Sequence, residues 1–214
     1  MLFKDRYLAG KLLAQKLQPY KNHPDAIILA IPRGGLETGF SLAKELNLPL
    51  DIVLTKKIGF PGNPEYAIGA VSLNSKVIVK TLISTGQVSQ SYVDEEIKKI
   101  RALLQERYKQ YLGDKPSLDL KNKIVIITDD GAATGQTLLA AIELIRKEKA
   151  KKIIVAVPVG HPDTVEELRK KAEVVCLESP ADFFAVGQFY QHFEQVSDEQ
   201  AIRLLREANK KNDN

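Results

Sequence analysis

The amino-acid sequence predicts an α/β fold that is doubly wound around a mainly parallel sheet. Short runs that are almost wholly apolar, such as residues 26–31 and 153–159, alternate with segments whose apolar residues recur at helical spacing. Strands that helices cover on both faces have this near-continuous apolar character. We expect a single domain over residues 1–214, long enough to bury a sizeable core. In such folds the ligand binds at the carboxyl ends of the strands.

The first half of the chain is predicted to alternate helix and strand and then to form a hairpin. Leucines at helical spacing predict a first helix, which Pro19 ends, and short apolar runs predict the strands. Leu73-Asn74-Ser75 separates two strand-like runs, which indicates a hairpin. The expected elements are a helix over residues 8–17, a strand over 26–31, a helix over 39–46, a strand over 51–56, and hairpin arms over 67–72 and 76–81.

The second half is predicted to hold one long helix and three further strands. Apolar residues recur every three or four positions over residues 92–112, and Gly113 follows them, which is typical of an amphipathic helix and its end. Residues 197–200, Ser-Asp-Glu-Gln, have the form of a capping box for the last helix. The other expected elements are a strand over residues 123–128, a helix over 135–147, a strand over 152–157, a helix over 163–171, and a strand over 173–177.

The composition argues against several classes of protein. The chain has 31 basic and 27 acidic residues, but the two signs are interleaved, as on a solvated surface, so we expect no nucleic-acid partner. A single cysteine, Cys176, forbids an intrachain disulfide, and with three histidines it leaves too little for a structural zinc site. No apolar run approaches the roughly 20 residues of a membrane helix, and the first residues do not form a signal peptide. We therefore expect a cytoplasmic protein without a membrane partner.

Two adjacent acids followed by a loop of small residues form the strongest motif. A predicted buried strand ends at Thr128 and is followed by Asp129, Asp130 and a turn that opens a helix. Helix N-terminal amides and the Thr134 and Thr137 hydroxyls suit an anion, and the two carboxylates suit sugar hydroxyls as acceptors. An ordinary Asp-Gly turn with a threonine cap is the simpler alternative. The order of acids, small residues and hydroxyls favours binding of a phosphorylated sugar.

A second glycine-rich turn follows the strand over residues 26–31. Arg33, Gly34 and Gly35 lead directly into the next predicted helix. The two glycines allow backbone amides to approach an anion closely, and the arginine offers a fork of donors to phosphate oxygens. By itself this turn would be an ordinary strand-to-helix connection. Its place at the same sheet edge as the acid pair makes it a candidate anion site.

These two motifs resemble those of the type I phosphoribosyltransferases. In that family the two acids hold the ribose hydroxyls of 5-phosphoribosyl-1-pyrophosphate, the loop after them holds the 5-phosphate, and the glycine-rich turn is the pyrophosphate loop. The resemblance implies a fold of that type with Mg²⁺ bound through pyrophosphate and ribose oxygens, and it marks residues 87–113 as an insert in the family core. The implied substrate-binding residues are Arg33, Gly34, Gly35, Asp129, Asp130, Gly131, Ala132, Ala133, Thr134, Gly135, Gln136 and Thr137.

A basic segment is the candidate for a mobile catalytic loop. Lys56 and Lys57 are predicted to end a strand of the sheet, and residues 56–66, with two glycines and two prolines, are predicted to form a loop. Family members carry basic residues here, so the resemblance implies a lid that excludes water as pyrophosphate leaves. Lys57 is the candidate catalytic lysine, with Arg33, Asp129 and Asp130 as the other catalytic residues. Solvated charges at a strand end are the alternative.

The segment over residues 178–196 is similar to the base-binding hood of the hypoxanthine-guanine enzymes. It is aromatic-rich, and the resemblance places Phe184 on a planar base and Val186 at the edge of that base. The chain departs from those enzymes at Ala133, Val159 and Gln191, where they carry Asp, Lys and Asp, so the acceptor stays open. The combination of motifs looks most like that of the uncharacterised, predicted members of the family.

The resulting prediction is a transferase that moves 5-phosphoribosyl from its 1-pyrophosphate to a nitrogenous, nucleobase-like acceptor. Both partners are small molecules, and a homodimer stays open as the assembly. Two other classes remain as alternatives. One is a non-catalytic regulator that binds the sugar pyrophosphate or a nucleotide, and the other is a phosphohydrolase or phosphorylase that acts on a nucleoside phosphate.

Overall fold

A five-stranded, wholly parallel sheet forms the centre of the computed structural model, which describes residues 2–78 and 80–210. The strand order is β2-β1-β6-β7-β8. The chain adds β2 on one side of β1 and then adds β6, β7 and β8 on the other side, so the strand order reverses between β1 and β6. This arrangement confirms the predicted α/β fold. The strands are β1 (Ala26–Ala30), β2 (Leu50–Ile52), β6 (Ile124–Thr128), β7 (Lys152–Val159) and β8 (Glu173–Glu178).

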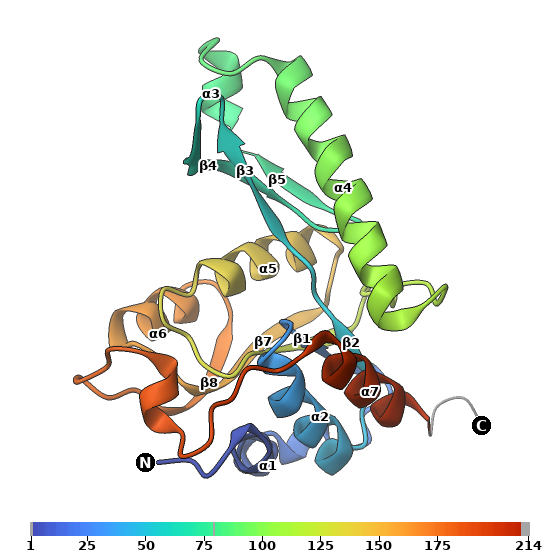
Figure 1. Ribbon diagram of the computed structural model, residues 1–214, viewed down its shortest axis with the longest axis vertical. Coiled ribbons are helices and arrows are strands. Elements are labelled where there is room, and N and C mark those ends of the chain that lie inside the picture. Colours follow the sequence, from blue (N-terminus) through green and yellow to red (C-terminus); the bar gives the residue numbers. More distant parts are fainter. Residues whose placement is uncertain (1, 79, 211–214) are drawn as a thin grey trace.

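Helices cover both faces of this sheet, as Figure 1 shows. Side chains of β1 alternate between the two cores: Ile28 packs with the helices of one face, and Ile27 packs with those of the other. The first face carries α1 (Arg6–Lys16), α2 (Gly35–Leu46) and α7 (Asp198–Asn209), and the second carries α5 (Gln136–Lys147) and α6 (Pro162–Arg169). Two short 3₁₀ helices, η1 (Gln18–Tyr20) and η2 (Val186–Phe189), complete this part of the chain. No helix in the described ranges is long and apolar enough to cross a membrane.

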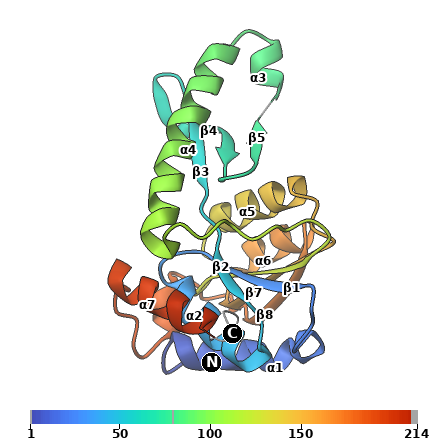
Figure 2. The same cartoon turned by 90° about the vertical axis from the view of Figure 1, so that its right-hand side faces the viewer.

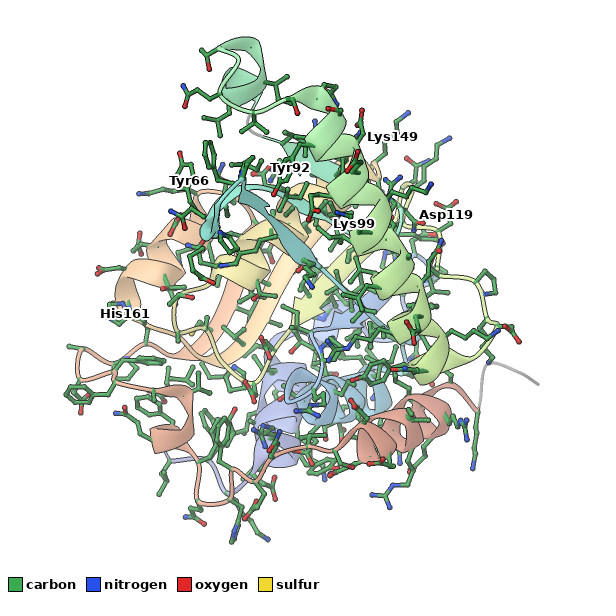
Figure 3. The ribbon with its side chains drawn as sticks, turned by 45° about the horizontal axis from the view of Figure 1, so that its top comes forward. Tyr66, Tyr92, Lys99, Asp119, Lys149 and His161 are labelled. Carbon is green, nitrogen blue, oxygen red and sulfur yellow. The ribbon has the colours of Figure 1, made fainter. Side chains whose placement is uncertain are left out.

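A second, antiparallel sheet rises from the parallel one above α5 (Figures 1 and 2). We call it the hairpin sheet; it consists of β3 (Lys56–Phe60), β4 (Asn63–Val71) and β5 (Lys76–Ile78). The chain continues through α3 (Lys80–Ser84) into α4 (Gln90–Leu112), which runs beside this sheet. Figure 3 labels Tyr92 on α4, whose hydroxyl donates a hydrogen bond of 3.0 Å to the Gly59 carbonyl. The long inserted helix therefore braces the hairpin sheet.

Two predictions about residues 51–66 were wrong. The parallel strand ends at Ile52, and Lys56 begins β3 of the hairpin sheet instead of ending a strand of the central one. Residues 56–66, predicted as a loop, form most of a strand pair with shifted register around Gly59. A β-carbon at Gly59 would lie 2.6 Å from Pro64 Cα, so glycine permits the close approach of the two strands. Gly59 and Pro64 therefore mark an irregular strand pair with a β-bulge. The sequence analysis interpreted the same glycine and proline as signs of a loop.

Other predicted elements survive with smaller corrections. The hairpin of residues 67–72 and 76–81 is confirmed as β4 and β5, but β5 ends at Ile78, residue 79 lies outside the described residues, and α3 was not predicted. Gly113 ends α4 with φ +67°, as its position suggested. The capping box at α7 is half formed: Ser197 accepts from the Gln200 amide, while the Gln200 side chain donates to Glu37 at 2.6 Å.

Candidate active site

The two predicted motifs begin side by side at the carboxyl edge of the sheet. Ala30 at the end of β1 is in register with Thr128 at the end of β6, and the Ile31 amide donates to the Thr128 carbonyl at 2.9 Å. This is also the point where the strand order reverses, which is where doubly wound sheets bind ligands. We call residues 33–35 together with residues 129–137 the edge site.

Close packing joins the glycine-rich turn to the acid pair. A β-carbon on Gly34 would lie 2.0 Å from Asp130 Oδ2, and one on Gly35 would lie 2.9 Å from Asp129 Cα. Real β-carbons do not approach other atoms this closely, so both positions require glycine while the acids stay in place. The Pro32–Arg33 peptide bond that precedes this turn is cis. The structure thus brings Gly34, Gly35, Asp129 and Asp130 into one site, as the sequence predicted.

The two carboxylates differ in their surroundings. Burial, followed by the charge of Asp130, raises the pKa of Asp129 well above its ordinary value. One Asp129 oxygen accepts a hydrogen bond of 2.8 Å from the Asp130 amide. Asp130 is paired instead with Arg6, whose Nε lies 2.8 Å from Oδ2. A half-buried acid beside a paired acid can accept hydrogen bonds from two sugar hydroxyls.

Sequence reasoning missed the residues that hold Asp130. Arg6 begins α1, Glu37 lies in α2, and Tyr190 follows η2; the Tyr190 hydroxyl donates to the Asp130 carbonyl at 2.6 Å. Burial raises the pKa of Tyr190, so it stays a neutral donor. No sequence signal marked these partners, because Arg6 precedes the helix predicted over residues 8–17 and forms no motif with Asp130.

The loop after the acids is tied to the next strand but open to solvent. Ala132 bridges to Gly160, and the Thr164 hydroxyl donates to the Ala133 carbonyl at 2.6 Å. Gly135 has φ +66° and stands at the N-cap of α5, where it has no side chain to satisfy the helix amides. Ala133, Thr134, Gln136 and Thr137 are exposed. Free N-terminal amides on a fixed loop make a ready anion site.

The two predicted basic residues lie on different parts of the molecule. Arg33 belongs to the edge site; its side chain is one-third exposed, and its Nη1 lies 3.8 Å from Asp198 Oδ1. Lys57 lies on β3, and its Nζ is 2.8 Å from Glu65 Oε2 on β4. The hydrogen bond from Lys57 lowers the pKa of Glu65. Lys57 lines a cavity of about 640 Å³, and Gln136, the first residue of α5 and part of the edge site, lines the same cavity.

The predicted hood divides into a packed part and an exposed part. Val186 packs on the edge site, because a β-carbon on Gly131 would lie 2.6 Å from Val186 Cγ1. Phe183 is buried with Phe189 and meets the ring of His161, labelled in Figure 3 at the start of α6, edge to face. Phe184 is 90% exposed. Its stacking on a base therefore stays a prediction, whereas Val186 is placed beside the predicted phosphate loop.

The donor set at the edge site fits Mg²⁺ bound mainly through a ligand. Within residues 2–78 and 80–210, no group of three or more His, Cys, Asp and Glu side chains is arranged to hold a metal ion. Mg²⁺ keeps several waters and often binds through one or two carboxylates plus substrate phosphates. Asp129 and Asp130 are a pair of carboxylates, which suits a metal that is held mainly through the oxygens of a bound ligand.

The acid pair and the glycine-rich turn lie at the switch point of a doubly wound sheet, which is where α/β proteins of this class bind their ligands. The model of the phosphoribosyl transferase domain matches residues 6–193. Candidate phosphoribosyl transferases of Mycobacterium tuberculosis, strains CDC 1551 / Oshkosh and H37Rv, are each 37% identical over 211 residues, which is 98% of this chain and 47% of theirs. The crystal structure of TT1426 from Thermus thermophilus is 39% identical, with a TM-score of 0.86 over 97% of this chain and 99% of that one.

The chain therefore belongs to the type I phosphoribosyltransferase family. This confirms the resemblance that the two sequence motifs carried. The chain spans about half the length of the curated relatives that it matches.

Proposed function

We propose that this protein transfers the 5-phosphoribosyl group from 5-phosphoribosyl-1-pyrophosphate to a nitrogenous, nucleobase-like acceptor. In this reaction the bond from C1 of the ribose to pyrophosphate oxygen breaks, a bond from C1 to the acceptor nitrogen forms, and the acceptor proton passes to solvent. The observation that carries the proposal is the contact of the acid pair with the Gly34–Gly35 turn. Family membership over residues 6–193 supports the same reaction class.

Each part of the edge site has a place in this reaction. The carboxylates of Asp129 and Asp130 accept hydrogen bonds from the two ribose hydroxyls. The amides of the loop over residues 131–137 and the Thr134 and Thr137 hydroxyls bind the 5-phosphate. Arg33 and the amides of Gly34 and Gly35 hold the pyrophosphate as its charge grows. Mg²⁺, when bound, neutralises pyrophosphate and ribose oxygens.

Lys57 completes the site from the hairpin sheet. It is half exposed and paired with a surface carboxylate beside an open cavity, so it is free to change partner. Movement of the hairpin sheet toward the edge site would bring its charge to the departing pyrophosphate and exclude water. The acceptor binds against the hood, with Val186 at its edge and Phe184 available for stacking.

A panel of nucleobases and related heterocycles tests the proposal. Each is incubated with the sugar pyrophosphate, Mg²⁺ and the protein, and pyrophosphate release is measured. We expect release that depends on one acceptor and disappears in the Asp129→Asn, Asp130→Asn double variant. Binding of the sugar pyrophosphate without acceptor-dependent release would favour the non-catalytic regulator. Release that needs only water would favour a hydrolase.

A further inference from the structure

Arg6 is a buried charge that the proposed reaction has not used. It is the first residue of α1, and only 5% of it is exposed. A buried guanidinium is costly unless carboxylates and carbonyls satisfy it. Its contacts therefore indicate what the fold uses it for.

The guanidinium of Arg6 joins three separate segments around the edge site. Nε donates to Asp130 Oδ2 at 2.8 Å, Nη1 donates to the Glu194 carbonyl at 2.9 Å, and Nη1 lies 3.4 Å from Glu37 Oε2. The ring of Phe193 lies 3.8 Å from the guanidinium carbon, in a cation–π contact. Arg6 thus links the acid pair to α2 and to the end of the hood.

The surroundings hold this link in one geometry. Glu37 accepts a second hydrogen bond, from Gln200 Nε2 at 2.6 Å, which fixes it against α7. A β-carbon at Gly34 would lie 3.2 Å from Arg6 Nε, so the guanidinium also packs directly beneath the glycine-rich turn. The contact of Arg6 with Asp130 Oδ2 therefore holds one carboxylate oxygen in a fixed position at the sheet edge.

We propose that Arg6 is a positioning residue, which orients the Asp130 carboxylate for the ribose hydroxyl and couples that orientation to residues 193–194 of the hood. This inference rests on the proposed function, because it assumes that the sugar pyrophosphate binds at the edge site. Arg6 acts through Asp130 and does not touch the substrate. Ordering of the hood by an acceptor would then tighten the grip on the ribose.

Two substitutions of Arg6 separate its geometry from its charge. Arg6→Gln removes both, whereas Arg6→Lys keeps a charge that can reach Asp130 but loses the planar fork. We expect Arg6→Gln to weaken calorimetric binding of the sugar pyrophosphate with Mg²⁺ by about 10- to 100-fold, since small misplacements of a binding group have effects of this size. Arg6→Lys should restore part of the affinity. Arg169→Gln, at an exposed ion pair on α6, is the matched control and should bind as the wild type does.

Loss of folding is separated from loss of positioning by two further variants. Arg6→Gln combined with Glu37→Gln removes the charge of one of the two acids that lose Arg6 as a partner, so it keeps the test available if the single variant melts early. Asp130→Asn is then added to Arg6→Gln. If Arg6 works through Asp130, the second substitution has little further effect on affinity, whereas independent roles give losses that multiply.

The outcomes distinguish this inference from the function on which it rests. A wild-type protein that binds neither the sugar pyrophosphate nor ribose 5-phosphate overturns both. Wild-type binding with equal affinity in a folded Arg6→Gln variant overturns the role of Arg6 alone. Multiplicative losses in Arg6→Gln and Asp130→Asn would also overturn it, because they show a general structural contribution. The inference is supported if Arg6→Gln with Asp130→Asn loses little more affinity than Arg6→Gln alone, and if Arg6→Lys restores part of the affinity.

Discussion

The edge site and the hairpin sheet differ in the surroundings of their charged groups. At the edge site, Arg6 is buried and paired with Asp130, and glycines at positions 34 and 35 let the backbone pack against the acids. On the hairpin sheet, Lys57 and Glu65 form an exposed pair above a cavity of about 640 Å³. One region has its charges fixed by packing, and the other has them free to exchange partners.

This difference assigns the two regions different shares of the reaction. A preorganised site binds the ground state of its ligand, because its groups are already in place. A group that reaches the ligand only as charge develops contributes more to the transition state than to the ground state, and such contributions raise the rate of the chemical step. The edge site should therefore determine the affinity for the sugar pyrophosphate, and the hairpin sheet should determine turnover.

Removing both charges of the acid pair should have the largest effect. In the Asp129→Asn, Asp130→Asn variant an amide presents donors where the ribose hydroxyls need acceptors. Two lost hydrogen bonds to charged groups predict a fall in affinity of about 100-fold or more by calorimetry. Asp119→Asn, on an exposed loop, is the control for charge. Wild-type affinity in a double variant with native circular dichroism would contradict the ribose role.

Lys57→Ala should lower turnover more than affinity, which is the opposite of what we expect for the acid pair. We expect turnover to fall by about 100-fold, the effect of losing one donor to developing charge, while the affinity for the sugar pyrophosphate changes little. Steady-state kinetics and calorimetry on the same preparations separate the two. Lys99→Ala, on the exposed face of α4, is the matched control. Equal losses in kcat and affinity would mean that both regions are simple binding surfaces.

The edge site was predictable because each of its two parts, residues 33–35 and residues 129–137, is a continuous motif in the sequence. A buried strand, the residues at its end and the helix that follows all lie within about one short segment, and parallel strands bring such segments to one edge. Asp129, Asp130, Gly34 and Gly35 were therefore located without knowledge of the tertiary structure. The partners of these residues were not, because Arg6 and Asp130 are 124 positions apart. A single arginine in a helix carries no pattern that names its partner.

The hairpin sheet was less predictable for a physical reason. Residues 63–67 of β4 are exposed, so they lack the alternation of apolar and polar residues that identifies a half-buried strand. Gly59 and Pro64 further resemble a turn until their close approach is seen. The Lys57–Glu65 pair could only be located once this strand pairing was known.

The same substitution in the two regions should have different consequences. Gly34→Ala places a β-carbon against Asp130, so we expect a loss of roughly 1–3 kcal/mol in the free energy of unfolding, as for other overpacked sites, together with weaker sugar binding. Gly62→Ala meets open space, and only its φ of +77° opposes it, at about 1 kcal/mol. Its affinity for the sugar pyrophosphate should stay unchanged. Urea unfolding and calorimetry compare the pair, and equal effects on affinity would show that Gly34 is a turn residue only.

Two neighbouring phenylalanines test the acceptor side of the edge site. Phe184 is 90% exposed, so Phe184→Ala should leave the melting temperature nearly unchanged while it weakens acceptor binding by roughly 1–3 kcal/mol if the ring stacks on a base. Phe183 is buried, and Phe183→Ala should lower the free energy of unfolding by about 3–5 kcal/mol. Unaltered acceptor affinity in Phe184→Ala would remove that residue from the site.

The smallest expected effect is the pH dependence of stability, where the two regions should differ in sign. Burial raises the pKa of Asp129, so the folded protein holds that proton more tightly than the unfolded chain does. The free energy of unfolding should therefore fall as the pH rises above about 4, the pKa of an unfolded aspartate, toward the raised value. The hydrogen bond from Lys57 lowers the pKa of Glu65, so its contribution is present above about pH 4 and is lost as the pH falls below that.

Asp129→Asn and Glu65→Gln each remove one of these two contributions to the change of the free energy of unfolding with pH. An asparagine at position 129 keeps an oxygen that can accept from the Asp130 amide, so the loop geometry is retained while the proton is removed from the balance. We expect Asp129→Asn to flatten the decline in stability above pH 4, and to leave the protein more stable than the wild type at neutral pH. Glu65→Gln should change the free energy of unfolding only above about pH 4, where the Glu65 carboxylate is charged. The change should be small, because the Lys57–Glu65 pair is exposed. Urea unfolding at intervals from pH 3 to 8 measures both. If the Asp129→Asn curve ran parallel to that of the wild type, the Asp129 carboxyl would have the same pKa in the folded and unfolded states. The half-buried acid of the edge site and the exposed acid of the hairpin sheet would then not differ in how they affect the pH dependence of stability.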